Sequence, residues 1–344
     1  MPEVAVSPLQ AREEEAQLAD YKQAGVDLDV HAGLIGHIRA LAATTSRPGV
    51  IGGVGLFAGT FALGDGPGAP VLVASTDSVG TKVLLAAECG CHEAVGRDVV
   101  VHSANDVCTS GAAPLFFLDY LAVHSLESVA VLEIVGGVAA ACREVGCALI
   151  GGETAQMPDL YRAGTYDLAG TMVGTVPRDR LVQPSPRPGD VVVGVPSTGL
   201  HTNGFSLVRR ILTETGTDPR EHADDLLRPS RLYSGDVARL LAEGATIRGM
   251  AHITGGGLPG NLDRALGANC DAVLESGSWA RPPVFDWLRD LGGISEGEMR
   301  RVFNLGVGFC VIVPAAEADA VCTLVPGARR IGAVVSGAGQ VWFS

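Results

Sequence analysis

The stretch "VLVASTDSVGTKVLLA" at residues 71–86 joins two apolar runs through a short polar interruption. The first run, 71–75, is short and β-branched, which is typical of a buried strand. The second, 81–90, has a helical pattern that closes at Gly90. The stretch therefore predicts a strand, a tight turn and a helix, with Asp77 projecting where the strand ends.

The polar interruption offers the groups that a magnesium-bound phosphate needs. Asp77 supplies a carboxylate oxygen, the ligand type that Mg²⁺ prefers. Gly80 permits a tight turn or the close approach of a phosphate, and Thr81 and Lys82 open a helix whose first N–H groups attract anions. An ordinary turn, with Asp77 capping the helix and Lys82 in solvent, explains the same residues, so both interpretations stay open at this point.

The rest of the chain alternates between strand-like and helix-like patterns. Four prolines between residues 175 and 190 interrupt this alternation, and proline is excluded from helix interiors and central strands. We therefore predict an α/β protein of the α+β type with two mixed α/β domains. The expected strands are 71–75, 114–123, 147–152, 191–199 and 308–314, and the expected helices are 81–90, 94–110, 131–145, 203–216 and 237–244.

Composition excludes several classes of protein. The 344 residues carry a formal net charge of −13, which argues against a non-specific nucleic-acid surface. No apolar run approaches the roughly 18 residues of a membrane span, and the acidic N-terminus is unlike a signal peptide. Eight cysteines are scattered without a paired motif, which favours reduced thiols and a cytoplasmic location. Cys89, Cys91 and His92 resemble a metal cluster only weakly.

Two further segments place acidic groups beside permissive backbone. In "HSANDVCTSGA" (102–112), Asn105 and Asp106 fall inside an expected helix, where such residues are unfavourable unless a ligand compensates or the helix is exposed or frayed there. In "IGGETAQMPDLY" (150–161), Glu153 follows an expected strand and two glycines. Together with Asp77, these residues give three carboxylates in similar settings.

Three glycine-rich loops could contact phosphate. "GGVGLFAG" (52–59) contains Gly53 and Gly55 but lacks the following helix that a dinucleotide fingerprint requires, so it is either a phosphate cover or a surface turn. A second loop presents His201 and Asn203 ahead of a helix. The third, in 251–262, contains Gly255, Gly256 and Gly257. Backbone N–H groups in such loops bind anions, although a lone loop histidine is more often a packing residue.

Nine motifs together resemble one family, the phosphoribosylformylglycinamidine cyclo-ligases. The resemblance runs from about residue 21 to the C-terminus. The motifs, in order, are "YKQAGVD" (21–27), "TDSVGTK" (76–82), "AND" (104–106), "PLFFLDY" (114–120), "GGETAQMP" (151–158), "YDLAGTMVG" (166–174), "GLHTNGFSLVR" (199–209), "HITGGG" (252–257) and "FNLGVGF" (303–309).

The resemblance implies a reaction and an architecture. It implies ATP- and Mg²⁺-dependent closure of the imidazole ring of aminoimidazole ribonucleotide from formylglycinamidine ribonucleotide, with release of ADP and phosphate. It also implies a homodimer formed through the sheets of the N-terminal domains. We expect a flexible N-terminal extension at 1–20, an ATP-binding and dimerisation domain at 21–176 and a C-terminal α/β domain at 177–344.

The resemblance also assigns roles to individual residues. It implies that Asp77, Asp106 and Glu153 hold the metal, and that His201, Lys82 and Asp106 are catalytic. The implied nucleotide site comprises Gly53, Gly55, Asp77, Gly80, Thr81, Lys82, Asn105 and Glu153. The implied substrate site comprises His201, Asn203, Gly255, Gly256 and Gly257.

Two positions depart from the family pattern, and two alternatives remain. Ser78 stands where glycine is usual, which would strain the backbone if a positive φ were needed there. Leu56 also stands where glycine is common, which weakens the interpretation of its loop as a phosphate cover. A related phosphotransferase, of the selenophosphate synthetase or thiamine-monophosphate kinase type, fits less well. The first usually has a reactive Cys or selenocysteine near its N-terminus, and this chain has no cysteine before Cys89. A non-catalytic nucleotide-binding protein would be expected to lack the three carboxylates.

Overall fold

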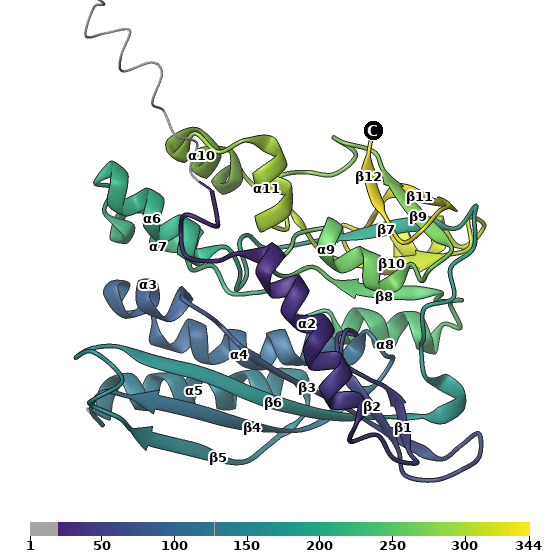
Figure 1. Cartoon of the computed structure of the whole chain (residues 1–344), viewed down its shortest axis with the longest axis horizontal. Helices are drawn as coiled ribbons and strands as arrows, with labels where there is room; N and C mark the ends of the chain where they lie inside the picture. Colours follow the sequence, from purple (N-terminus) through teal and green to yellow (C-terminus); the bar gives the residue numbers. More distant parts are fainter. Residues whose placement is uncertain (1–19, 127) are drawn as a thin grey trace, which may run out of the picture.

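The computed structural model describes residues 20–126 and 128–344. The expected extension at 1–20 therefore lies, apart from its last residue, outside the described residues. Two six-stranded mixed sheets organise the fold, one in each half of the chain, and both halves also contain helices (Figure 1). This arrangement confirms the predicted mixed α/β class.

The first sheet has the strand order β1-β2-β3-β6-β4-β5. Only β4 and β5 are parallel, and the other neighbours are antiparallel. The strands are β1 (Val50–Gly52), β2 (Gly59–Ala62), β3 (Pro70–Ser78), β4 (Ala113–Val123), β5 (Ala148–Gln156) and β6 (Tyr166–Pro177). The helices of this half are α2 (Leu28–Ala43), α3 (Lys82–Cys89), α4 (His92–Cys108) and α5 (Ser128–Val145).

The second sheet has the order β12-β9-β11-β7-β10-β8. Its strands are β7 (Val191–Pro196), β8 (Gly249–His252), β9 (Cys270–Leu274), β10 (Val307–Val313), β11 (Arg329–Ser336) and β12 (Val341–Phe343). Its α-helices are α6 (Phe205–Thr215), α7 (Ala223–Leu226), α8 (Ser234–Ala242), α9 (Pro259–Leu262), α10 (Pro283–Gly292), α11 (Glu296–Val302) and α12 (Ala318–Leu324). Short 3₁₀ turns lie at Arg178–Arg180, Pro219–His222 and Asp263–Ala265.

The opening stretch folds as expected, with one difference. β3 is followed by a turn at Gly80, which has φ +55°, and then by α3, which Gly90 closes in a left-handed conformation. The strand continues to Ser78 instead of ending at Ser75, because pairing with β6 extends to the Ser78–Ala169 partners. Asp77 is therefore the penultimate residue of β3.

α4 lies between the two halves of the molecule. It packs against β3, β4 and β6 on one side and contacts β8 and α8 of the second half on the other (Figure 1). Nearly all its residues from Val95 to Cys108 are buried, including the polar ones. Its polar residues are therefore neither exposed nor frayed, and both halves of the chain supply their partners. Among the described residues, no helix combines the length and apolar character of a membrane span.

Candidate active site

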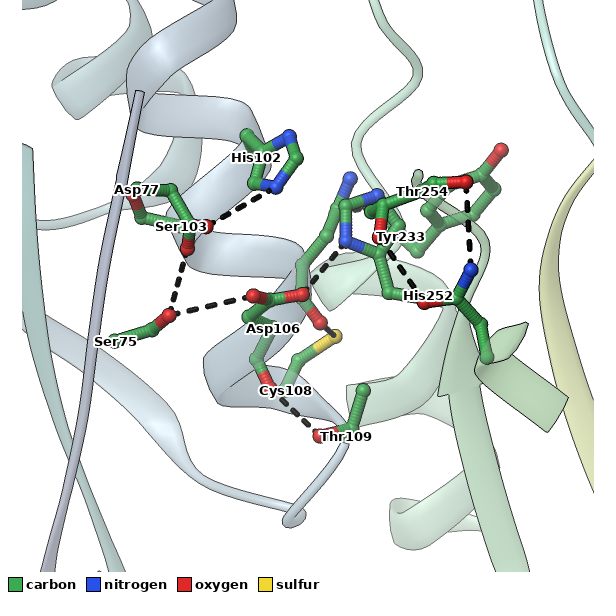
Figure 2. A network of polar contacts seen from close by, with 12 residues as sticks. Ser75, Asp77, His102, Ser103, Asp106, Cys108, Thr109, Tyr233, His252 and Thr254 are labelled. Atoms are coloured by element: carbon green, nitrogen blue, oxygen red, sulfur yellow. Dashed lines mark hydrogen bonds and ion pairs between the residues drawn. The ribbon is translucent and has the colours of Figure 1, made fainter. Parts of the chain in front are cut away.

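A buried polar network joins the two halves of the chain where β3, α4 and β8 meet (Figure 2). His102 and Asp106 lie one turn apart on α4, so both face the same way. Asp77 approaches from β3 and His252 from the end of β8. The network thus brings together two of the three predicted carboxylates, Asp77 and Asp106.

The two carboxylates are close neighbours. The Ser75 Oγ lies 2.7 Å from Asp77 Oδ2 and 3.3 Å from Asp106 Oδ2. The imidazoles flank the pair, with His102 Nε2 3.5 Å from Asp77 Oδ1 and His252 Nδ1 2.8 Å from Asp106 Oδ1. His102 is held in place by Thr202, whose Oγ1 lies 2.6 Å from its Nδ1.

The charges in this network are unequal. Burial opposes ionisation of Asp77, but His102 outweighs it and holds the pKa of Asp77 below its usual range. Burial would lower the pKa of His102, yet Asp77 and Asp106 raise it to about 9. Burial and then the charge of Asp77 raise the pKa of Asp106 well above its usual range. A second negative charge is therefore disfavoured here unless a cation joins the site.

This donor set suits a divalent cation. Two carboxylates that share one hydroxyl offer the hard oxygen ligands that Mg²⁺ prefers, and a cation would offset the cost of ionising Asp106. His102, Asp106 and His252 also place potential ligand atoms within 4.8 Å of one another. Nitrogen ligands suit transition metals better, so the oxygen pair is the part of the cluster that fits Mg²⁺.

Glu153 lies apart from this cluster. β5 continues past it to Gln156, so the residue is inside the strand and not at its end as expected. In the pairing register, Glu153 is opposite Tyr120, whereas Asp77 is aligned with Gly170, Asp119 and Gly152. The exposed Glu153 is thus three strands away from Asp77. Because side chains alternate along a strand, it also lies on the opposite face of the sheet.

His201 lies in the loop between β7 and α6 and is almost completely buried. Its Nε2 accepts backbone N–H bonds from Thr198 at 3.3 Å and Arg231 at 3.4 Å, so Nδ1 carries the proton. That Nδ1 is buried without a hydrogen-bond partner. Burial, followed by the charges of His252 and Lys82, lowers the pKa of His201 well below its usual range. The ring is therefore a neutral donor with one free N–H.

Lys82 is placed differently from the expectation that it contacts a nucleotide phosphate. It is completely buried, and its Nζ donates to Asp98 Oδ2 at 2.5 Å and to the His201 carbonyl at 2.7 Å. The alternative interpretation, a lysine in solvent, is wrong, while the contact with a nucleotide phosphate remains a prediction. The neighbouring Thr81 is partly buried, and its Oγ1 lies 3.0 Å from Ser206 Oγ.

Asn105 is buried and uses both ends of its amide within the protein. Its Nδ2 donates to the Arg231 carbonyl at 2.9 Å, and its Oδ1 accepts the Tyr233 N–H at 2.8 Å. These bonds fix the segment that supports the His201 ring. In this arrangement the amide contributes to the site through that segment, while its predicted role in contacting nucleotide remains a prediction.

The glycine loops converge on the same junction from both halves. Gly59 of β2 pairs with Ala74, so the loop with Gly53 and Gly55 lies at the end of the sheet where Asp77 is found. From this loop Phe57 is buried among residues of the second half, with Arg264 5.0 Å above its ring. In the described chain only His201 and Leu305 have positive φ among non-glycine residues, so Leu56 and Ser78 are not strained.

The loop after β8 is shaped by Asn261. Its Nδ2 donates to the carbonyls of Thr254, Gly255 and Gly257 at 3.3, 3.2 and 2.8 Å. Gly256 and Gly257 have positive φ, and a Cβ on Gly257 would overlap the Arg300 carbonyl. A Cβ on Gly255 would be 3.2 Å from Asn203 Nδ2, so the two predicted substrate loops lie side by side.

Sequence reasoning did not single out His102, His252, Asp98 or Asn261. His102 and His252 are within the motif segments 102–112 and 252–257, but no spacing links residues 150 positions apart. The available signal was the four-residue spacing of His102 and Asp106, which places both on one face of a helix.

Comparisons with known proteins agree with this two-part architecture. The sequence model of "AIR synthase related protein, N-terminal domain" matches residues 60–176, and that of "AIR synthase related protein, C-terminal domain" matches 187–342. A phosphoribosylformylglycinamidine cyclo-ligase of Synechococcus sp. (strain CC9605) is 49% identical over 311 residues, covering 88% of this chain and 90% of that protein. One from Thermosynechococcus vestitus is 45% identical and covers 94% and 98%.

Solved structures share the fold at low sequence identity. AaThiL complexed with AMPPCP and TMP superposes with a TM-score of 0.64 at 18% identity, covering 90% of this chain and 92% of that one. Hydrogenase maturation protein HypE in complex with ATP gives a TM-score of 0.62 at 21% identity, covering 81% and 82%. These likenesses concern the fold alone.

Proposed function

Because this chain belongs to the phosphoribosylformylglycinamidine cyclo-ligase family of purine-biosynthesis enzymes, we propose that it closes the imidazole ring of aminoimidazole ribonucleotide at the junction of its two halves. The observation that carries this proposal is the meeting of Asp77 and Asp106 with the loops of His201 and Gly255–Gly257. The carboxylates that could hold a cation and the loop that carries His201 therefore meet at one junction, where His102 contacts Thr202 of that loop.

The proposed reaction begins with activation of a poor leaving group. The terminal phosphoryl group of ATP moves to the formyl amide oxygen of formylglycinamidine ribonucleotide, and ADP leaves. An amidine nitrogen then attacks the formyl carbon, and the carbon–oxygen bond breaks as phosphate departs. Such transfers depend chiefly on positioning and charge neutralisation. That requirement matches a site that offers carboxylates, glycine loops and a neutral imidazole.

Asp77 and Asp106 would hold Mg²⁺, which supplies charge neutralisation at the transferring phosphoryl group. The unpartnered Nδ1–H of His201 would donate to a substrate oxygen that gains negative charge. Asn203 and Gly255–Gly257 would bind the ribose phosphate through amide and backbone N–H groups. Gly53, Gly55, Gly80, Thr81 and the segment fixed by Asn105 would surround the nucleotide.

We also propose a homodimer formed through the first sheet. Ala74, Thr76 and Ser78 are exposed on the face of β3 that turns away from α4, and Leu115 of β4 and Ile150 of β5 are exposed apolar residues of the same sheet. A second copy would bury this face and bring Glu153 to the interface. A role of Glu153 at the metal would then require the partner subunit.

The domain boundary and the location of the protein are proposals of the same kind. The two family matches lie on either side of the proline-rich segment 177–186, which supports a division between 176 and 177. The eight cysteines, all in the described part of the chain, are free thiols, which supports the cytoplasm.

The proposal is tested by incubating purified protein with formylglycinamidine ribonucleotide, ATP and Mg²⁺ while both products are followed. We expect aminoimidazole ribonucleotide and ADP to form one to one, and neither to form without Mg²⁺. ADP without the imidazole product would indicate a phosphotransferase with another acceptor. ATP binding with no product would indicate a nucleotide-binding protein.

A further inference from the structure

Lys82 and Asp98 form an ion pair that is fully withdrawn from water between α3, α4 and the His201 loop. Burying two charges is costly, and a well-packed apolar pair often serves stability equally well. The ammonium is fully engaged: it donates to Asp98 Oδ2 and to the His201 carbonyl, and it lies 5.1 Å above the Phe205 ring. All three partners are buried protein groups, so a nucleotide phosphate that enters from solvent would not displace them.

Asp98 is connected to His201 indirectly through two sets of hydrogen bonds. Through Oδ2 it holds Lys82, which holds the His201 carbonyl. Through Oδ1 it accepts the Ser230 N–H at 2.8 Å, and the next residue, Arg231, donates its own N–H to the His201 ring. One carboxylate on α4 therefore anchors both the backbone and the imidazole of a residue from the other half of the chain.

The anchored residue is in an unfavourable conformation. His201 has φ +60°, in the left-handed region that is unfavourable for a residue with a Cβ. Such conformations persist where surrounding contacts over-determine them. Asn304 adds to these contacts, because its Nδ2 donates to the Gly199 carbonyl at 2.8 Å. Without its anchors, the loop would be free to relax and turn the Nδ1–H of His201 elsewhere.

We propose that Lys82 and Asp98 act together as positioning residues that hold His201 in its reactive conformation, and that Lys82 does not bind nucleotide phosphate. This inference rests on the proposed function for its effect on turnover. Two further expectations do not depend on turnover. Nucleotide affinity should be independent of the Lys82–Asp98 ion pair, whereas the environment of the His201 ring should depend on this ion pair.

The test compares wild type with the double variant Lys82→Met/Asp98→Asn. The single Lys82→Met variant would leave Asp98 charged and unpaired in the interior, so it is expected to fold poorly. The double variant removes both charges, while the side-chain oxygen of the new amide still accepts the Ser230 N–H. The control is Arg330→Met/Asp319→Asn, which removes an exposed ion pair between β11 and α12.

Three quantities are measured: the dissociation constant of a non-hydrolysable ATP analogue by calorimetry, turnover at saturating substrates, and the ¹H–¹⁵N signals of the histidine rings. We expect the double variant to bind the analogue within about threefold of wild type, to lose about 100-fold in turnover and to shift the His201 signals. The control should match wild type in all three.

A tenfold or larger loss of analogue affinity, with unchanged turnover at saturation, would overturn the inference and return Lys82 to the phosphate site. Unchanged histidine signals would also overturn it. If wild type makes no imidazole product at all, the proposed function fails, while the affinity and the histidine signals still decide whether the pair positions His201.

Discussion

Replacing Asp106 by Asn is expected to lower turnover by about 100-fold or more while the protein remains folded. The change keeps the shape of the side chain but removes the negative charge that a divalent cation would require. Because burial and the charge of Asp77 already favour the uncharged form of Asp106, the neutral amide should not destabilise the fold. Asp77→Asn should act in the same direction.

The measurement is turnover as a function of Mg²⁺ concentration, with thermal unfolding as the check on folding. Glu243→Gln, which changes an exposed carboxylate at the end of α8, is the matched control and should behave as wild type. Wild-type turnover and Mg²⁺ dependence in Asp106→Asn would remove this residue from the metal site.

Replacing His201 by Asn should reduce turnover more than it reduces ATP affinity. Asparagine tolerates the left-handed backbone found at this position but does not place an N–H where the imidazole Nδ1 lies. Loss of one preorganised donor to a developing negative charge typically costs 10²–10³-fold in rate. We therefore expect turnover to fall about 100-fold, with ATP affinity changed less than about threefold.

His37→Asn, on the exposed surface of α2, is the control for this substitution. If ATP affinity collapsed while turnover at saturation stayed unchanged, His201 would belong to the nucleotide site instead. The ratio of wild-type to variant turnover should also stay constant between pH 8 and 6, because the lowered pKa keeps the ring neutral throughout. If His201 were instead a general base with a pKa near 6.5, the ratio of wild-type to variant turnover would fall progressively below that pH.

The local elements were predictable because each has its own signal in the sequence. The β-branched run at 71–75, the helical spacing of 131–145 and the stop at Gly146 correspond to β3, α5 and its end. Strand ends were less predictable, since β3 and β5 continue as far as their partners pair with them. Polar residues inside the helix α4 indicated that some group must compensate for their burial, but the sequence did not indicate which group.

The site was predictable only in part, for reasons of topology. Asp77 and Asp106 lie in elements that follow closely in sequence and pack together, so the expectation that they meet was sound. Glu153 was grouped with them by a similar local pattern, but strand order places it three strands away, and no local pattern encodes strand order. The partners of Lys82 are 16 and 119 residues away, beyond the reach of any spacing rule.

We propose above all that phosphoryl transfer to the formyl oxygen drives ring closure at this site. The most direct test supplies formylglycinamidine ribonucleotide labelled with ¹⁸O in the formyl group and follows the label by mass spectrometry during a single turnover. We predict that one ¹⁸O atom appears in each phosphate released, since the carbon–oxygen bond breaks with the oxygen attached to phosphorus. Release of the label into water, with unlabelled phosphate, would show that the formyl oxygen is not phosphorylated.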